Sequence, residues 1–309
     1  MSLLSTPSAR PERLFSLLSL VRAMRGRIAP DEARAWLAPK FRSAETEKDT
    51  DPDRERKAMG RVRETFWVAR DLKLLNEAGD HWVSSTDLPD TRRKLALYVH
   101  AHLRVLDVEH FDSVPLRAYA WYGAFVEEFG LYGTITQAAA TLASEIAAAL
   151  DPLQGVPSDS TEDTKVFNTT KFPAWKDWMG FLGLGHIDLP GTKGFLPDPT
   201  RRVAEELASI TDLPAQLEAT NFLSIISDRL PYLDGGTMFA KAFAQRGLRP
   251  PHGVASRLLS QALRNLHDLG ALSLRVDGDT TTGLGLSKDP LSKVQFFSRV
   301  EFTPGLRDV

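Results

Sequence analysis

Apolar positions recur with a helical period over most of the chain, and the clearest case lies near its end. Residues 254–269 place apolar side chains at the spacing of one buried helix face. Gly270 follows, where a left-handed cap is favoured. Residues 272–276 then alternate between apolar and polar, which predicts a half-buried strand, and residues 284–286 can supply a returning strand.

Two shorter helices are predicted before this one, over residues 219–230 and 237–246. The order helix, helix, longer helix and hairpin is typical of a winged helix. The aromatic and β-branched residues 294–302 could add a strand to the hairpin or dock on a partner chain.

The beginning of the chain shows a similar order of elements. Apolar positions predict a buried helix over residues 11–24, a short extended piece and a second helix over residues 30–37. Residues 42–56 are polar and lack periodicity, which indicates an exposed loop. A third, strongly basic helix is predicted over residues 58–75, and residues 81–83 could form a stub of strand.

Residues 91–150 show helical periodicity and no hairpin pattern. Residues 166–214 then contain a unit of helix, glycine, strand, turn and strand. This unit matches the second half of a winged helix, or alternatively an isolated helix and hairpin packed on the C-terminal domain. We predict a mostly α fold with small β-hairpin wings, in which tandem winged helix-turn-helix modules are joined by a helical middle domain. The predicted segments are an N-terminal winged helix (1–90), the helical middle domain (91–150), a linker (151–165), a partial winged-helix-like unit (166–214) and a C-terminal winged helix (215–309).

Composition excludes several classes of protein. A length of 309 residues suits two or three domains, and 42% hydrophobic and 25% charged residues are usual for globular chains. No window approaches eighteen uninterrupted apolar residues, and the opening does not match a secretory signal, so the cytoplasm is the expected location. The absence of cysteine excludes disulfides, thiolate nucleophiles and cysteine-based zinc sites.

The net charge of −2 is unevenly distributed. Residues 1–75 hold 16 Lys and Arg against 11 Asp and Glu, whereas residues 76–309 hold 22 against 29. Only the N-terminal quarter therefore has a bulk electrostatic case for binding nucleic acid. Ordinary solvated helix faces would explain the same asymmetry.

No catalytic motif is evident. The chain lacks a Walker motif, a GxGxxG before a helix, a GxSxG and an HExxH. His100 and His102 would point to different sides of a helix, with no carboxylate four residues further on, so a metal site is not expected there. The aspartates of residues 49–53 lie in the predicted loop, with no strand to fix them for a metal nuclease. We predict a non-enzymatic protein without metal or cofactor.

Nucleic-acid contact is the remaining chemistry. A winged helix places its third helix in the major groove and its wing near phosphates. Acidic Asp268, Asp277 and Asp279 flank this surface in the C-terminal unit, so protein contact is an equal alternative there. The residues expected on its exposed side and wing are His252, Ser256, Arg257, Gln261, Arg264, Arg275 and residues 280–282.

The third helix of the N-terminal unit is the better candidate for duplex DNA. Lys57, Arg61 and Arg63 lie on or near its polar face, partly offset by Glu55 and Glu64. A looser cluster in the partial unit combines Lys171, Lys176 and Lys193 with Arg201 and Arg202. Tryptophans can stack on bases, but the spacing of Trp175 and Trp178 is more typical of a helix core.

The opening residues SLLSTPSARPERLFSLLSLVRAM, followed by a predicted winged helix and further wings, resemble one family. Its members are encoded in bacterial clusters that insert 7-deazapurines into DNA and restrict unmodified DNA. The resemblance implies a non-enzymatic accessory subunit of a restriction or antiphage system and no catalytic residue. More generally, a chain with tandem winged helices resembles several bacterial groups that use them. These groups are transcription regulators, defence-island DNA sensors and winged-helix partners of SMC-type ATPases.

The functional prediction is therefore DNA binding or scaffolding inside a multi-subunit bacterial defence complex, with duplex DNA and other subunits as partners and no membrane contact. A winged-helix transcription regulator is one alternative, favoured by a separate dimerisation surface and affinity for one palindrome. A structural adaptor of an SMC-type or helicase ATPase is the other, favoured by the acidic balance of residues 76–309.

Overall fold

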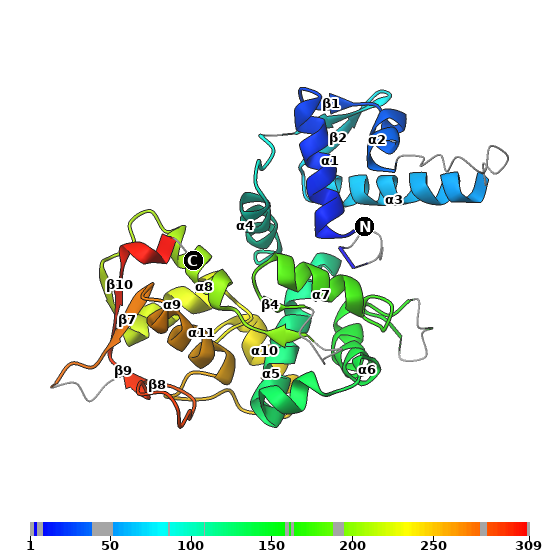
Figure 1. Cartoon of the computed structure of the whole chain (residues 1–309). Coiled ribbons are helices and arrows are strands. Elements are labelled where there is room, and N and C mark those ends of the chain that lie inside the picture. Colours follow the sequence, from blue (N-terminus) through cyan, green and yellow to red (C-terminus); the bar gives the residue numbers. More distant parts are fainter. Residues whose placement is uncertain are drawn as a thin grey trace, which may run out of the picture.

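The computed structural model describes residues 3–4, 9–38, 52–85, 87–107, 109–157, 161, 164–187, 195–278 and 283–307. Within them the chain is mostly helical, with small antiparallel sheets (Figure 1). This confirms the prediction of a mostly α fold. None of the described helices has both the length and the apolar composition that crossing a bilayer requires.

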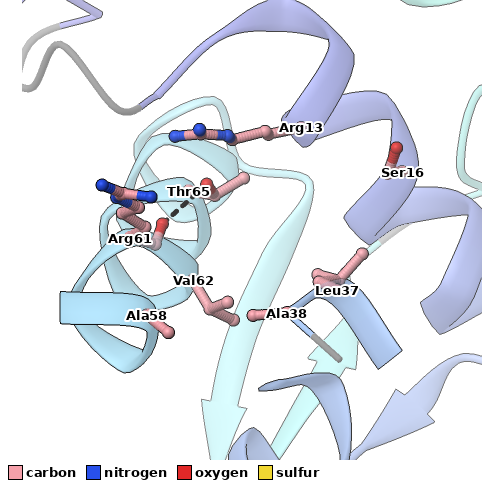
Figure 2. Close-up of a pocket in the computed structure, with 8 residues that line it drawn as sticks. All are labelled: Arg13, Ser16, Leu37, Ala38, Ala58, Arg61, Val62 and Thr65. Atoms are coloured by element: carbon pink, nitrogen blue, oxygen red, sulfur yellow. Dashed lines mark hydrogen bonds between the residues drawn. The ribbon is translucent and has the colours of Figure 1, made fainter. Parts of the chain in front are cut away.

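The first third of the chain folds as helix, strand, two helices and two strands. Its elements are α1 (Pro11–Ala23), β1 (Arg27–Ile28), α2 (Pro30–Leu37), α3 (Pro52–Asp71), β2 (Leu75–Ala78) and β3 (His81–Ser84). β3 pairs antiparallel with both β1 and β2. α3 packs on α1 and α2, and a pocket of about 190 Å³ lies between the three helices (Figure 2).

α3 ends earlier than its apolar pattern predicts. The buried Leu72, Leu74 and Leu75 continue the helical period, but the backbone of Lys73 adopts a left-handed conformation with φ 60°. The amide of Leu74 then donates to the carbonyl of Ala69 at 2.8 Å and closes the helix. The prediction of helix over residues 58–75 is wrong at both ends. α3 already begins at Pro52, within the residues predicted to be an exposed loop, and the last predicted turn is instead the approach to β2.

The middle of the chain is built around one helix whose first thirteen residues are all buried. Its elements are α4 (Arg92–Leu103), the 3₁₀ turn η1 (Phe111–Ser113), α5 (Val114–Ile135), α6 (Ala139–Leu150) and η2 (Asp151–Gln154). Every residue from 114 to 126 of α5 is buried, because α6, α7, α10, α11 and β5 all pack against this helix. α5 bends at Gly130, whose φ of 73° interrupts the helical backbone.

Two tryptophans attach the next helix to the core. The elements that follow are α7 (Phe172–Phe181), β4 (Gly185–His186), β5 (Leu196–Pro197) and α8 (Thr200–Ala208). Trp175 and Trp178 are fully buried, and their indole N–H groups donate to the carbonyls of Pro115 at 3.0 Å and Ala9 at 3.1 Å. The prediction that these side chains belong to the core is confirmed.

The C-terminal third contains the longest-range strand pairing. Its elements are β6 (Gln216–Glu218), α9 (Ala219–Arg229), α10 (Thr237–Gln245), α11 (Arg257–Asp268), β7 (Leu272–Arg275), β8 (Leu284–Gly285), β9 (Phe296–Phe297), β10 (Arg299–Phe302) and η3 (Pro304–Arg307). α9, α10 and α11 confirm the three helices predicted there. β7, however, pairs with β10, and β8 pairs with β9. The prediction that residues 284–286 return against the first strand is therefore wrong, because β10 occupies that edge of β7 with β6 on its other side.

The two three-stranded sheets share one strand order. In the N-terminal sheet the order is β1-β3-β2, and in the C-terminal sheet it is β6-β10-β7. In each, the strand after the first helix pairs with the last strand, which pairs with the strand after the long helix. The first helix of the C-terminal group is α8, which packs on α11 and η3. The domain boundary predicted between residues 214 and 215 would place α8 outside the C-terminal group on which it packs.

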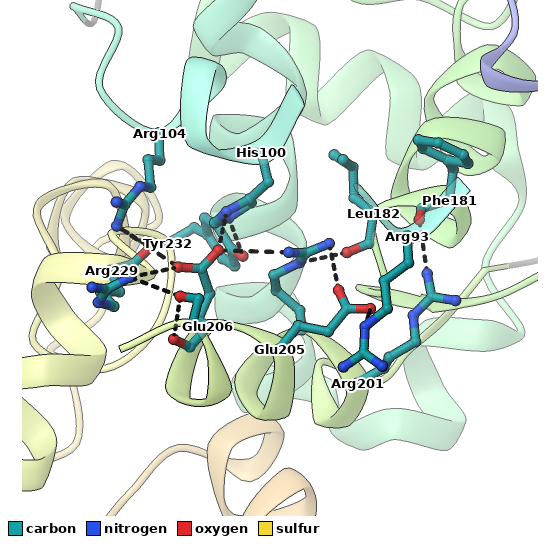
Figure 3. A network of polar contacts seen from close by, with 12 residues as sticks. Arg93, His100, Arg104, Phe181, Leu182, Arg201, Glu205, Glu206, Arg229 and Tyr232 are labelled. Carbon is teal, nitrogen blue, oxygen red and sulfur yellow. Dashed lines mark hydrogen bonds and ion pairs between the residues drawn. The ribbon is translucent and has the colours of Figure 1, made fainter. Parts of the chain in front are cut away.

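A buried network of charged side chains joins α4 to α8 (Figure 3). Arg202 is fully buried and forms ion pairs with Glu205 at 2.9 Å and Glu206 at 3.5 Å. His100 Nδ1 lies 2.8 Å from Glu206 Oε1, and its Nε2 lies 2.9 Å from the hydroxyl of Tyr232. A neutral ring protonated on Nδ1 can therefore donate toward the carboxylate and accept from the tyrosine. Arg202, predicted to join an exposed basic cluster, is instead an internal counterion.

The protonation states in this network follow from its burial. Burial lowers the pKa of His100 to about 4, and Arg202 adds to this effect while Glu206 opposes it. Burial alone would raise the pKa of Glu206, but His100, Arg202 and Arg104 outweigh it and lower the pKa to about 2. The folded chain thus holds a neutral imidazole beside a carboxylate.

We predict that the folded chain loses stability as pH falls from 6.5 toward 4. The unfolded chain takes up a proton on His100 near pH 6.5, whereas the folded chain resists it to about pH 4. The free energy of unfolding should therefore fall by up to about 1.4 kcal/mol per pH unit from this group. Urea denaturation between pH 7.5 and 5 measures the slope. His100→Asn should reduce this dependence of the unfolding free energy on pH. The control His252→Gln, at an exposed position, should leave it unchanged. Equal slopes in the two variants would contradict the assignment of the pH dependence to His100.

Candidate nucleic-acid interface

α3 separates an apolar side from a basic side. Its buried residues include Val62, Thr65, Phe66, Val68 and Ala69, and this side faces α1 and α2. Exposed basic side chains lie at Arg56, Lys57, Arg61, Arg63 and Arg70. Arg56, Arg63 and Arg70 are seven residues apart, about two turns of helix, so they form one row along the exposed side.

Three of these cations are not neutralised by the described part of the chain. Among the described residues, no ion pair or side-chain hydrogen bond involves the charged groups of Lys57, Arg61 or Arg63. Arg70 differs, since it contacts Asp71 at 3.4 Å. Cations that are solvated and lack a carboxylate partner can neutralise phosphates and release counterions. The three predicted site residues of the N-terminal unit are therefore all available for such contact.

Arg61 lies apart from the exposed row and faces the pocket between the helices. Figure 2 shows its guanidinium beside that of Arg13, which α1 supplies. Partial burial is the largest cause that lowers the pKa of Arg13, and the positive charges of Arg61 and Arg10 add to it. Sequence reasoning missed Arg13, because only the packing of α1 on α3 brings it beside Arg61.

In the C-terminal unit, two of the predicted contact residues point inward. Ser256 is only 3% exposed and caps α11, and its amide and hydroxyl both donate to Asp234 at 2.6 Å. Arg264 is 6% exposed, and its guanidinium donates to the carbonyls of Ser287 at 2.7 Å and Val294 at 3.2 Å. The prediction that these side chains are exposed is wrong, because α11 packs between α5 and α8 and the segment before β9 covers Arg264.

Three of the other predicted residues of this unit are exposed but already have polar partners. Arg257 Nε lies 4.0 Å from Glu127 Oε1, and Arg275 Nε lies 3.0 Å from Glu301 Oε2. Gln261 donates to the side chain of Asn265 at 2.8 Å. His252 is exposed, and residues 280–282 lie outside the described residues. The exposed part of α11 is thus narrow and nearly neutral, which disfavours insertion into a groove lined by phosphates.

The basic cluster predicted around α7 does not form one surface. The ammonium of Lys171 donates to the carbonyl of Lys165, and Lys176 Nζ lies 5.8 Å from the centre of the Phe172 ring. Lys193 lies outside the described residues. The guanidinium of Arg201 donates to the carbonyls of Gly180 and Phe181 at 3.0 and 2.7 Å, so it holds the end of α7.

Neither metal candidate from the sequence gains support. His100 is buried in the network that joins α4 to α8, and residues 49 and 51 lie outside the described part of the chain. Across the described ranges, no three His, Asp or Glu side chains are grouped so that they could hold a metal ion.

Residues 128–280 match the model of a family described as DpdG-like. The match covers just under half of the chain, and it is consistent with an association with the 7-deazapurine DNA-modification clusters that the opening residues resemble. No curated protein and no solved structure matches the chain. The matched segment begins within α5 and therefore excludes α3 and its basic row.

We predict that Arg264 acts in folding rather than in DNA contact. Arg264→Met removes the donors to two carbonyls of the segment between β8 and β9, so the free energy of unfolding should fall by about 2–3 kcal/mol. Arg257→Met, on the exposed side of the same helix, should change it by less than about 0.5 kcal/mol. Urea denaturation of both variants tests this, and equal losses would show that the carbonyl contacts contribute little.

Proposed function

We propose that this chain is a DNA-contacting subunit of a bacterial DNA modification and restriction system, with α3 as the contact helix. The observation that carries the proposal is the contrast between the two ends of the chain. Lys57, Arg61 and Arg63 are exposed and lack described carboxylate partners, whereas Arg257 and Arg275 each lie near a glutamate. Electrostatic attraction to phosphates is therefore strongest at the N-terminal unit.

We further propose that both end units are winged helices. The support is their common topology, in which a strand after the first helix pairs with the last strand of the unit. On this assignment α3 and α11 are the third helices, and the C-terminal unit begins at α8 with an additional helix before α11. Of these two helices, α3 is the one that presents a basic side to solvent, and we assign the C-terminal module the role of the body of the protein.

The partial unit in the middle can be completed in the same way. α6 and α7 both pack on α5, and β5 packs on α5 as well. We propose that α5, α6 and α7 with the β4-β5 pair form one module, whose front half comes from the segment that the sequence pattern assigned to the middle domain. Residues 151–165 then connect helices within this module rather than separate two domains.

The placement in a modification system rests on two separate parts of the sequence. Residues 128–280 match the DpdG-like family, and the opening residues resemble proteins of 7-deazapurine clusters. The proposed role is recognition and assembly, and we assign no catalytic residue. The chemistry of modification or cleavage would belong to other subunits.

Scaffolding is the second candidate role, and one surface favours it. The bend of α5 at Gly130 leaves Phe129 50%, Leu131 38% and Tyr132 79% exposed, side by side in the sequence and within the family match. Apolar side chains grouped on a surface often mark protein contacts. DNA contact at α3 and protein contact near this bend are compatible, because the two surfaces lie on different units.

We predict that removing two cations from α3 weakens duplex binding. Lys57→Gln combined with Arg63→Gln should raise the Kd for a generic duplex about tenfold or more at 50 mM salt, because two phosphate contacts are lost. Fluorescence anisotropy over about 50 to 200 mM salt gives both the Kd and its salt dependence.

The matched control is Lys241→Gln with Arg249→Gln, which removes the same two residue types from exposed positions near α10. This control should keep the wild-type Kd. Equal weakening in both double variants would reduce the effect to net charge and contradict a specific role for α3. Binding confined to one palindrome would favour a transcription regulator, and no binding at low salt would favour the scaffold.

A further inference from the structure

Gly60 lies in the interior of α3, in the middle of its basic side. Lys57 precedes it by three residues and Arg63 follows it by three residues, so both lie on the same side of the helix as Gly60. A step of three residues falls about 60° short of a full turn, because an α-helix has about 3.6 residues per turn. The two cations therefore flank Gly60, one on each side of it around the helix.

The folded chain gives no reason for a glycine at this position. The backbone of Gly60 is helical and lacks the positive φ that favours glycine, and a Cβ atom added there would meet no packed neighbour within 4 Å among the described residues. Two other helical glycines differ. A Cβ at Gly123 of α5 would lie 3.3 Å from Leu258, and one at Gly180 of α7 would lie 2.9 Å from Ile187. Packed side chains crowd those two positions, whereas position 60 has open space.

A glycine inside a helix lowers the stability of the fold. It loses more backbone freedom on folding than any other residue, and alanine in its place stabilises a helix. Alanine would fit at position 60 without a clash, so folding alone favours a side chain there. Glycine also suits positions at which a backbone must approach a ligand closely. The exposed Lys57 and Arg63 on either side indicate that such a ligand is anionic.

The dimensions of duplex DNA make this position sensitive to the size of a side chain. The major groove is about 12 Å wide, and an α-helix with its side chains is about 10–12 Å across. A helix therefore fills the groove, and a side chain directed at the floor of the groove limits how deep the helix can lie. Without one, α3 can lie deeper, which brings Lys57 and Arg63 closer to the phosphates along the two walls.

We propose that Gly60 is the point at which the backbone of α3 approaches the floor of the major groove most closely. The inference rests on the proposed function and deepens it, because it says which part of α3 faces the bases and which part faces the phosphates. Gly60 has no side chain with which to read a base, so it acts as a positioning residue. It sets the depth of the helix and thereby the reach of the two flanking cations.

The test is a series of uncharged substitutions at Gly60, measured by fluorescence anisotropy with a generic duplex at about 50 mM salt. Gly60→Ala should raise the Kd about two- to threefold and Gly60→Gln about tenfold or more, because each added atom crowds a filled interface. Stability should change in the opposite direction. Gly60→Ala should raise the melting temperature by about 1–2 °C, because alanine favours the helix and the space is open.

A double-variant cycle links Gly60 to a cation beside it. Arg63→Gln alone should weaken binding through the loss of a phosphate contact. In the background of Gly60→Gln the same change should weaken binding by a smaller factor, because a helix held away from the groove has already lost that contact. Fully multiplicative losses would overturn the claim that Gly60 sets the reach of Arg63.

The matched control is Ala244→Gln, which adds the same side chain at an exposed position of α10 and should keep the wild-type Kd. Wild-type affinity in Gly60→Gln, together with weakened binding in the combined Lys57→Gln and Arg63→Gln variant, would overturn this inference and leave the proposed function intact. A lower melting temperature in both Gly60 variants would assign the glycine to the fold and also overturn the inference. The absence of duplex binding by the wild type would overturn both.

Discussion

The burial of charge on α8 is the constraint on which the arrangement of the whole chain depends. α8 carries Arg202 three and four residues before Glu205 and Glu206, and all three have almost no contact with water. Removing such groups from water costs several kcal/mol each unless partners compensate. Arg202 forms ion pairs with both glutamates, but the remaining carboxylate oxygens of Glu205 and Glu206 need partners from other elements. These come from distant parts of the sequence, so α8 can be buried only when those parts are in place.

α4 supplies most of these partners. His100 lies against Glu206, Arg93 lies 3.5 Å from Glu205, and Arg104 lies 3.9 Å from Glu206, while Arg229 approaches from the end of α9 (Figure 3). α4 is also the helix that follows the N-terminal sheet. The same contacts that satisfy α8 therefore attach the N-terminal unit to the C-terminal body. A buried charge that lacks its partner is strongly destabilising. The network therefore disfavours arrangements in which the two units are only partly assembled.

The sequence predicts the elements of this fold better than it predicts their partners. Helical periodicity located the helices α1, α2, α9, α10 and α11, and it placed Trp175 and Trp178 in the core. Periodicity cannot show which strand β7 will pair with, because β8 and β10 both offer apolar residues at alternate positions. The choice depends on β6, which extends the sheet on the far side of β10. The pairing of β6 with β10 joins residues about eighty positions apart in the sequence.

The same limit explains the errors at the candidate sites. Ser256, Arg264 and Arg202 are polar residues that the sequence pattern assigns to exposed surfaces, but other parts of the folded chain cover them. Asp234 accepts from Ser256, and backbone carbonyls accept from the two arginines. α11 is covered by both α5 and α8, so its polar residues cap the helix or hold backbone carbonyls. α3 is covered on one side only, and its predicted cations remain exposed. Whether packed elements cover the polar side of a candidate helix, as well as its apolar side, thus decides whether its basic residues can reach a ligand.

The residues of the family match lack elements on which their own fold depends. Residues 128–280 include α11 and β7 but exclude β10, the central strand of the C-terminal sheet, and the fully buried part of α5. A segment without its central strand and its main packing helix would expose a large apolar surface. The matched residues therefore depend on the rest of the chain for their fold, and through α5 and α8 they depend on α4. The N-terminal unit with its basic helix lies beyond the match, yet it is attached to the matched body by buried contacts that a loosely tethered module would not need.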